Sequence, residues 1–426
     1  MQVVWYKRDL RLRDHAPLAA AAQAGPVLCL YVYEPALLQS DEFDAAHFAF
    51  IEECLAELDA GLRQHGAWLT TRTGRMPDVL DELHARAPIH ALHSHEETGN
   101  QITYDRDRRV GAWARRQGIP WHEYPQTGVI RRLQTRDGWA ARWAQRMRQA
   151  QAPGPTRLTP APGIEVPVRP TATALGVKPA ERPERMRGGE AQAHTVLGTF
   201  LEHRGVNYRK DMSSPVQGWE GCSRLSPYLA WGAISMKQVY QAARTRKEAL
   251  RAMEQDGAAI DRRWFGALQS FEARLRWHCH FTQKLEDEPR LEFENLARVY
   301  DGLREDAFDE DRFDAWCAGQ TGYPMVDACI RALQAGGWIN FRMRAMLVSF
   351  SSYHLWLHWR RPGLFLGRLF LDFEPGIHWS QTQMQSGTTG INTVRIYSPR
   401  KQVLDQDPDG VFIRKYVPEL ADFPKA

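Results

Sequence analysis

The sequence lacks the features that mark membrane proteins and secreted disulfide scaffolds. It contains no run of about 18 apolar residues, the length that spans a bilayer, and its start turns charged at Lys7, before the apolar region of a signal peptide can form. Its six cysteines include no CxxC pair, and a chain of 426 residues does not depend on disulfides for its core. We therefore expect a cytoplasmic protein with reduced thiols and no membrane association.

The chain also has little net charge, +4, but the charge is distributed unevenly. Acidic residues outnumber basic ones in residues 1–128, whereas residues 331–404 carry nine Lys and Arg against two Asp and Glu. Such a basic segment is typical of a site for a polyanion, and it is equally typical of a solvated protein face. Fifteen tryptophans are an unusually large number.

Short apolar runs alternate with helical patterns over the first 125 residues. The expected strands cover residues 3–6, 26–32, 67–72, 89–94 and 120–124. Between the second and third of these runs, apolar residues recur at spacings of three and four, which predicts a helix that ends before Gly66; they are Phe48, Ile51, Leu55, Leu58 and Leu62. Alternation of strand and helix predicts a doubly wound, mainly parallel sheet with helices on both faces.

Proline interrupts this pattern after the first unit. Six prolines lie between residues 153 and 170, which predicts an extended linker because proline cannot donate to a helix or a sheet. A short helix is expected around Trp139 to Met147. From about residue 190 the pattern is helical, with helices expected near residues 191–204, 224–243, 261–286, 324–335 and 338–359. The predicted organisation is an α/β domain at 1–128, a linker at 129–189 and an all-helical domain at 190–426.

Two groups of residues in the helical region carry chemistry. Tyr208 and the run from Cys222 to Ser226 offer hydroxyl, thiol and backbone donors ahead of a helix, as in an anion site for a diphosphate. An ordinary N-cap followed by proline explains the same run, and the spacing leaves both readings open.

The second group is centred on Arg344, which stands among apolar residues and needs a carboxylate partner if it is buried. Asp372 and Glu374 are the nearest acidic residues in the basic segment. The spacing places Trp338 and Phe341 on one helix face, together with Ala345 and Val348, and Arg344 on another. A structural ion pair and a functional one fit these residues equally well.

The order of several sequence blocks resembles the photolyase/cryptochrome family over nearly the whole chain. The blocks are VWYKRDLRLRDHAPL, CSRLSPYLAWG, TGYPMVDACIRAL, GWINFRMR, LFLDFE and RIYSPRKQ. The resemblance implies an N-terminal α/β domain, a linker and a helical domain that binds FAD. It leaves a second, antenna chromophore open, because no motif identifies one. No cysteine follows Cys329, so neither an iron–sulfur cluster nor another metal site is expected.

The resemblance also implies a set of cofactor-binding residues, with Asp372 pairing with Arg344 near the flavin. Cys222 replaces a threonine that is frequent in relatives, and His378 replaces the asparagine that photolyases commonly present to flavin N5. The tautomer of His378 is open at this point. The full expected set is Tyr208, Cys222, Ser223, Arg224, Leu225, Ser226, Trp338, Arg344, Asp372, Glu374 and His378.

For catalysis, the resemblance implies that Trp277 stacks on the lesion, and the expected set is completed by Trp338, His378 and Met384. Three positions depart from the family pattern. Arg274 replaces a carboxylate, Phe341 a polar residue, and Met384 a second stacking tryptophan. The two histidines that mark repair of (6-4) photoproducts fall at Phe341 and Ala345, so cyclobutane dimers are the expected substrate.

The family's tryptophan chain is kept at Trp359, but its flavin-proximal member falls at Thr382, so Trp379 and Trp356 are the expected substitutes, with Trp316 as a further candidate. Phosphate contacts to ultraviolet-damaged DNA are expected from basic residues, namely Arg342, Arg395, Arg400 and Lys401. The resemblance thus implies a monomeric deoxyribodipyrimidine photolyase. A cryptochrome-type photoreceptor is the main alternative, and a nonphotochemical DNA-binding flavoprotein is a second.

Overall fold

The computed structural model describes residues 1–165, 168–178, 182–391 and 393–422, so parts of the expected linker, Pro167 among them, lie outside the described residues. The chain forms two compact units. Unit 1 comprises Met1–Ala180, Arg187–Val196 and Leu225–Ala242, and unit 2 comprises Glu181–Met186, Leu197–Arg224 and Ala243–Ala426. These units follow spatial contacts, and the division at 128/129 and 189/190 stays a prediction about sequence modules.

Unit 1 is built on a five-stranded sheet in the order β3-β2-β1-β4-β5, and every pairing in it is parallel. All five predicted strands are confirmed, as β1 (Gln2–Tyr6), β2 (Val27–Tyr33), β3 (Leu69–Thr73), β4 (Ala91–His95) and β5 (Trp121–Tyr124). The strand order reverses beside β1, as in a doubly wound fold. The predicted fold class is therefore confirmed.

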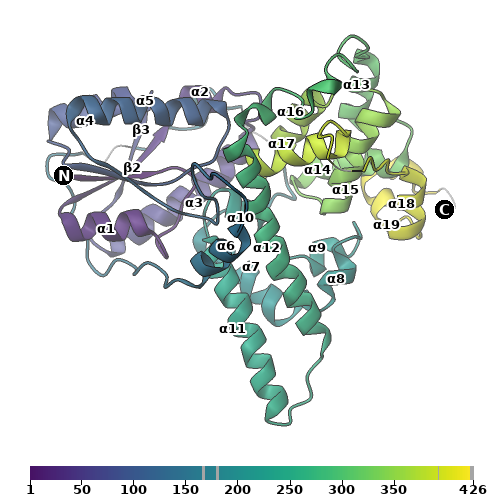
Figure 1. Cartoon of the computed structure of the whole chain (residues 1–426), viewed down its shortest axis with the longest axis horizontal. Coiled ribbons are helices and arrows are strands. Elements are labelled where there is room, and N and C mark those ends of the chain that lie inside the picture. Colours follow the sequence, from purple (N-terminus) through teal and green to yellow (C-terminus); the bar gives the residue numbers. More distant parts are fainter. Residues whose placement is uncertain (166–167, 179–181, 392, 423–426) are drawn as a thin grey trace. The chain divides into compact units, whose positions relative to one another are not determined.

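Helices cover both faces of this sheet, with α1 and α3 on one side and α4 and α5 on the other (Figure 1). Their bounds are α1 (Ala16–Ala24), α3 (Ala45–Gln64), α4 (Met76–Arg86) and α5 (Gln101–Gln117); the unit also contains α2 (Pro35–Leu38) and α6 (Trp139–Arg148). The predicted helix of Phe48 to Leu62 is α3. Alternate strand residues such as Val3 and Trp5 pack with α4 and α5 in one core cluster, because successive strand side chains point to opposite faces.

One expected helix is divided in two. The prediction near residues 224–243 was wrong, because the structure has α10 (Ser226–Ala230) followed by α11 (Met236–Gln255). Gly232 separates them with a φ of +66°, and a Cβ atom there would meet the carbonyl oxygen of Arg8 at 2.1 Å. Only glycine tolerates this conformation and this close approach together.

Unit 2 contains helices and, among its described residues, no strand. The helices beyond α7 (Glu190–Glu202) and α11 are α8 (Tyr208–Asp211), α9 (Gly218–Gly221), α12 (Arg263–Asp287), α13 (Glu310–Ala318), α14 (Pro324–Gly336), α15 (Phe341–Ser349), α16 (Arg360–Leu369), α17 (Pro375–Ser386), α18 (Pro399–Gln406) and α19 (Val411–Tyr416). Both α12 and α15 pack against α17. Because both helices pack against α17, the segment that precedes α17 lies beside α12 and α15.

The expected helix at 338–359 also differs from the structure. It begins only at Phe341, so Trp338 precedes the helix instead of sharing a face with Phe341, and it passes into a π-helix at Phe350–His354. Trp356 then takes a φ of +60°, a left-handed conformation that is rare for a bulky side chain. None of the described helices has the length and apolarity needed to cross a membrane.

Candidate functional site

Arg344 and Asp372 form a bidentate ion pair in unit 2. The Nη1–Oδ1 and Nη2–Oδ2 distances are 2.8 and 2.9 Å, and the Nε–H of Arg344 donates to the carbonyl of Ile339 at 2.8 Å. The Asp372 side chain is 3% exposed, whereas that of Arg344 is 21% exposed. Two parallel bonds fix the guanidinium plane, so α15 and the segment before α17 hold a cation in one orientation.

His378 lies on α17, close to this pair. Its Nε2 is 2.8 Å from the carbonyl oxygen of Gly363, so Nε2–H donates to it and the neutral ring keeps an acceptor at Nδ1. Burial, with a smaller effect from the charge of Arg344, lowers the pKa of His378 to about 4, against the opposing effects of the Gly363 bond and of the Asp372 carboxylate. The residue is therefore a neutral imidazole at physiological pH, which resolves the tautomer that the sequence left open.

Glu374 forms a second ion pair, in which His278 of α12 is the cation. His278 Nε2 lies 2.8 Å from Glu374 Oε2, and both side chains are 13% exposed. Thr282 donates its hydroxyl to Oε1 of the same carboxylate at 3.3 Å. Burial opposes the charge on His278, but the adjacent Glu374 carboxylate outweighs it and raises the pKa of His278 to about 10. One short segment thus positions both Arg344 and His278.

This second pair makes stability depend on pH. Because the pKa of His278 rises from 6.5 to about 10 on folding, its contribution is complete below pH 6.5 and is lost as the pH rises toward 10. Between neutral pH and pH 10, we expect the free energy of unfolding of the parent protein to fall by roughly 1–3 kcal/mol more than that of His278→Gln. Urea unfolding at a series of pH values measures this difference, and parallel curves for the two proteins would contradict it.

Three guanidinium groups influence the thiol of Cys222. The thiol has a pKa raised to about 12 by burial, and Arg204, Arg224 and Arg344 all act to lower it. Arg204 donates to the carbonyl of Cys222 at 2.7 Å, and burial together with the charge of Arg224 lowers its own pKa to about 10. This concentration of positive charge suits a ligand that carries phosphate groups.

Arg224 has two further features that suit such a ligand. It takes a φ of +58°, and its buried Nε has no hydrogen-bond partner among the described residues. Its guanidinium lies 4.8 Å from the ring of Trp219, which in turn lies 5.6 Å from the ring of Trp338. A buried donor without a partner costs free energy, so a diphosphate group at this place would fit the residues present.

The other expected cofactor residues are divided between the two units. Tyr208 is buried at the start of α8, with its ring against Phe200 and Phe271, and Ser223 lies next to Cys222 in unit 2. Leu225 is buried and Ser226 begins α10, and both belong to unit 1.

The expected lesion-facing and DNA-facing side chains are mostly at the surface. Trp277 on α12 is 47% exposed, and Met384 on α17 is half-buried. Arg342 donates to the hydroxyl of Ser213 at 3.2 Å. Arg395 and Arg400 are exposed, and Lys401 is also exposed but pairs with Asp405.

Two of the expected relay tryptophans are in contact. Trp359 and Trp379 are fully buried, with ring centroids 5.9 Å apart, and the Nε1–H of Trp359 donates to Asn295 at 2.7 Å. Trp379 packs against Gly363, and Thr382 packs against the same glycine. Trp379 therefore lies beside Thr382, the position at which the family's flavin-proximal tryptophan falls. Trp356 is 41% exposed and has the guanidinium of Arg304 over its ring.

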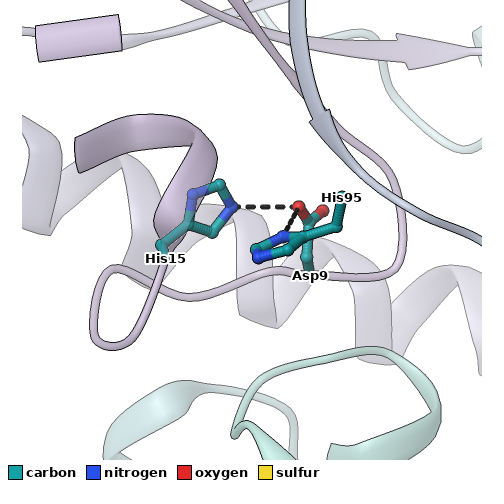
Figure 2. A group of neighbouring side chains, drawn as sticks. All are labelled: Asp9, His15 and His95. Carbon is teal, nitrogen blue, oxygen red and sulfur yellow. Dashed lines mark hydrogen bonds and ion pairs between the residues drawn. The ribbon is translucent and has the colours of Figure 1, made fainter. Parts of the chain in front are cut away.

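A separate cluster in unit 1 joins Asp9, His15 and His95 (Figure 2). Asp9 Oδ2 lies 2.9 Å from His15 Nε2 and 2.7 Å from His95 Nδ1. The backbone N–H of Leu18 donates to His15 Nδ1, so the neutral ring carries its proton on Nε2 and has no lone pair there for a metal ion. These bonds explain the cluster as a buried support for the loop after β1.

Comparison with known proteins identifies the family. Residues 2–152 match a family model described as DNA photolyase, and residues 271–426 match one described as the FAD binding domain of DNA photolyase. The chain belongs to the photolyase/cryptochrome family. It therefore carries this family's FAD-binding domain, and FAD is its cofactor.

The relatives bear both of the names used in this family. The chain is 29% identical to the deoxyribodipyrimidine photo-lyase of Streptomyces griseus, over 99% of this chain and 90% of the relative. It is 25% identical to cryptochrome DASH of Gloeobacter violaceus, over 100% of this chain and 87% of the relative. Membership of the family alone does not separate a repair enzyme from a photoreceptor.

Solved structures agree over nearly the full length. A bacterial class III photolyase from Agrobacterium tumefaciens superposes with a TM-score of 0.85 at 25% identity, over 99% of this chain and 87% of that one. An archaeal photolyase from Sulfolobus tokodaii superposes with a TM-score of 0.79 at 25% identity, over 100% of this chain and 92% of that one, and is described with two FAD molecules, implying a novel light-harvesting cofactor.

Sequence reasoning missed three residues of this site: Arg204, Trp219 and His278. Arg204 and Trp219 stand in no distinctive spacing, and their partners, Cys222 and Trp338, are found only through the fold. His278 adjoins Trp277, but the 2.8 Å contact with Glu374 crosses from α12 to the segment before α17. No sequence signal joins such distant positions.

Proposed function

We propose that this protein is a light-dependent DNA lyase that splits cyclobutane pyrimidine dimers. The observation that carries the proposal is the pair of the partly buried Arg344 and the buried Asp372 beside a neutral His378, within the FAD-binding domain of a photolyase/cryptochrome family member. Reduced FAD, when bound and excited by blue light, supplies an electron to the dimer and takes it back once the ring bonds have opened.

The residues of the chain prepare this chemistry by charge and position. Arg344 presents a fixed cation in a poorly solvated site, which favours a negatively charged ring next to it. His378 offers a neutral acceptor at Nδ1, and Arg204 and Arg224 neutralise the diphosphate. Asp372 keeps the guanidinium of Arg344 in place.

We further propose that Trp277 stacks on the lesion, with Trp338 and Met384 near it, and that basic residues hold the DNA backbone without sequence preference. The backbone contacts are assigned to Arg342, Arg395, Arg400 and Lys401. Relatives are named deoxyribodipyrimidine photo-lyase, which supports ultraviolet-damaged DNA as the partner.

A cryptochrome-type photoreceptor without repair activity is the second proposal. Relatives named cryptochrome support it, as do the residues near the proposed lesion site: Arg274 and Phe341 offer no hydrogen-bond acceptor to a pyrimidine. Both functions need the same FAD site, so only repair of the dimer in DNA distinguishes the lyase from the photoreceptor.

Blue-light irradiation of the reduced protein with a dimer-containing oligonucleotide tests the choice. We expect restored thymine in the light and none in the dark, with His378→Ala giving less product per absorbed photon because the acceptor at Nδ1 is lost. A protein that binds FAD and responds to light but restores no thymine is a photoreceptor and not a lyase.

A further inference from the structure

The two tryptophans that contact each other in unit 2 differ at their ring nitrogens. The Nε1–H of Trp359 donates to Oδ1 of Asn295 at 2.7 Å, and both residues are buried. The ring of Trp379 lies 5.9 Å away, and its buried Nε1 has no hydrogen-bond partner among the described residues. Two neighbouring rings of the same kind therefore have different polar surroundings.

Asp301 fixes the orientation of the Asn295 amide. The Nδ2–H of Asn295 donates to Asp301 Oδ1 at 2.9 Å. A carboxylate accepts hydrogen bonds and donates none, so the amide nitrogen faces Asp301 and the amide oxygen faces Trp359. Arg298 holds the other carboxylate oxygen, with its Nε 2.6 Å from Oδ2. The acceptor at Trp359 is thus itself held in place by hydrogen bonds.

Cations lie over two other tryptophans of the expected relay. The guanidinium of Arg304 lies 4.8 Å from the ring of Trp356, and that of Arg360 lies 6.0 Å from the ring of Trp379. Within the part of the chain that the structure describes, no cation lies over the ring of Trp359. The relay tryptophans therefore differ in nearby charge as well as in hydrogen bonding.

Both differences act on a ring that has lost an electron. Its positive charge makes the indole N–H a stronger donor, so a hydrogen bond to Asn295 favours the oxidised form of Trp359. A cation near a ring disfavours the oxidised form by Coulomb repulsion. His358, whose ring lies 5.2 Å from that of Trp359, has a pKa lowered by burial and adds no charge at physiological pH. Trp359 is therefore the ring of this group that accommodates a positive charge best.

We propose that Asn295 is a positioning residue of the electron relay, which holds the positive charge on Trp359 while bound FAD is photoreduced. Trp379 gives one electron to excited, oxidised FAD, and Trp359 then gives one electron to Trp379. An amide oxygen is too weak a base to take the proton, so Trp359 keeps its Nε1–H and remains a radical cation until a thiol reductant returns one electron. The inference rests on the proposed light-driven chemistry of FAD, and it does not require that DNA is repaired.

Asn295→Leu removes the acceptor from Trp359 with little change in side-chain size. A hydrogen bond to a charged group changes an equilibrium about ten- to hundred-fold. We expect the quantum yield of FAD photoreduction, measured on the FAD-loaded full chain with dithiothreitol, to fall by this factor because the electron returns to the ring before the thiol reacts. After a laser flash, the absorption of the tryptophan radical cation should also decay faster. A yield and a decay like those of the parent protein would overturn the proposal.

An NMR signal reports the same hydrogen bond in the dark. In the FAD-loaded protein, the indole N–H resonance that Trp359→Phe removes should move upfield in Asn295→Leu. Asp81→Ala is the matched control, because Trp113 is also fully buried and donates its Nε1–H to Asp81 at 2.6 Å. It should move only the Trp113 resonance and leave photoreduction unchanged. If Asn295→Leu moves its resonance but photoreduces like the parent, the role of Asn295 is structural and the proposal is overturned.

Asp301→Ala is a second variant at a more exposed position, since the Asp301 side chain is 38% exposed. It keeps Asn295 but removes the group that orients the amide, so we expect a smaller fall in the yield than in Asn295→Leu. No fall in either variant, or a parent protein whose FAD is not photoreduced, would overturn the proposal. If photoreduction depends on Asn295 as expected but the parent restores no thymine, the lyase assignment fails while the role of Asn295 stands.

Discussion

Asp372→Asn is expected to lower the free energy of unfolding by about 3 kcal/mol and to weaken the retention of FAD. Asparagine keeps the shape of the side chain but removes the charge that balances Arg344, whose bidentate partner lies 2.8 and 2.9 Å away. The guanidinium is then left short of a counter-charge in a mostly buried place. Chemical unfolding of the protein without FAD measures the first effect, and equilibrium binding of FAD measures the second.

Two comparisons separate the role of this pair from a general effect of charge. Arg361 and Glu310 form an equally short pair, but their side chains are 48% and 62% exposed, so Glu310→Gln should change stability by less than about 1 kcal/mol. Arg344→Lys keeps the charge and loses the planar fork, and it should fall between the parent and Asp372→Asn. If Asp372→Asn unfolds and binds FAD like the parent, the pair has no part in the site.

Local patterns predicted the strands of unit 1 and several of the helices, but not every element of the fold. The strands of unit 1 were read from apolar runs, and α3 from spacings of three and four, because burial on one or two faces imposes these periods. The predicted helix at 224–243 failed because the break at Gly232 depends on the backbone of Arg8, more than two hundred residues away. Propensity within a window carries no such information.

The candidate site also has one part that the sequence predicted and another that it could not predict. The possible pairing of Arg344 with Asp372 was predicted because an arginine among apolar residues needs a carboxylate and few are near. The sequence left the tautomer of His378 open, because the carbonyl of Gly363 that receives its Nε2–H lies on α16. The ion pair of His278 and the guanidinium groups around Cys222 depend on contacts between helices, which no single segment encodes.

Trp359→Phe and Trp379→Phe are each expected to nearly abolish photoreduction of bound FAD, while leaving its reduction by dithionite intact. The two rings are fully buried and their centroids are 5.9 Å apart, which suits the proposed relay, in which an electron passes from one ring to the other in series. Members of such a series are not additive, and the double variant should therefore be no slower than either single variant. Anaerobic illumination with an external reductant, followed by the bleaching of oxidised FAD, measures the rates.

Trp316→Phe tests the further candidate that the sequence offered and is the matched comparison for the contact of Trp359 with Trp379. Trp316 is also fully buried in unit 2, and its ring contacts Phe313 and Phe365. If buried tryptophans act only as core, all three substitutions should leave photoreduction as it is in the parent protein. A loss confined to Trp359→Phe and Trp379→Phe assigns the route to their contact, and a further loss in Trp356→Phe would make the exposed Trp356 its outer end.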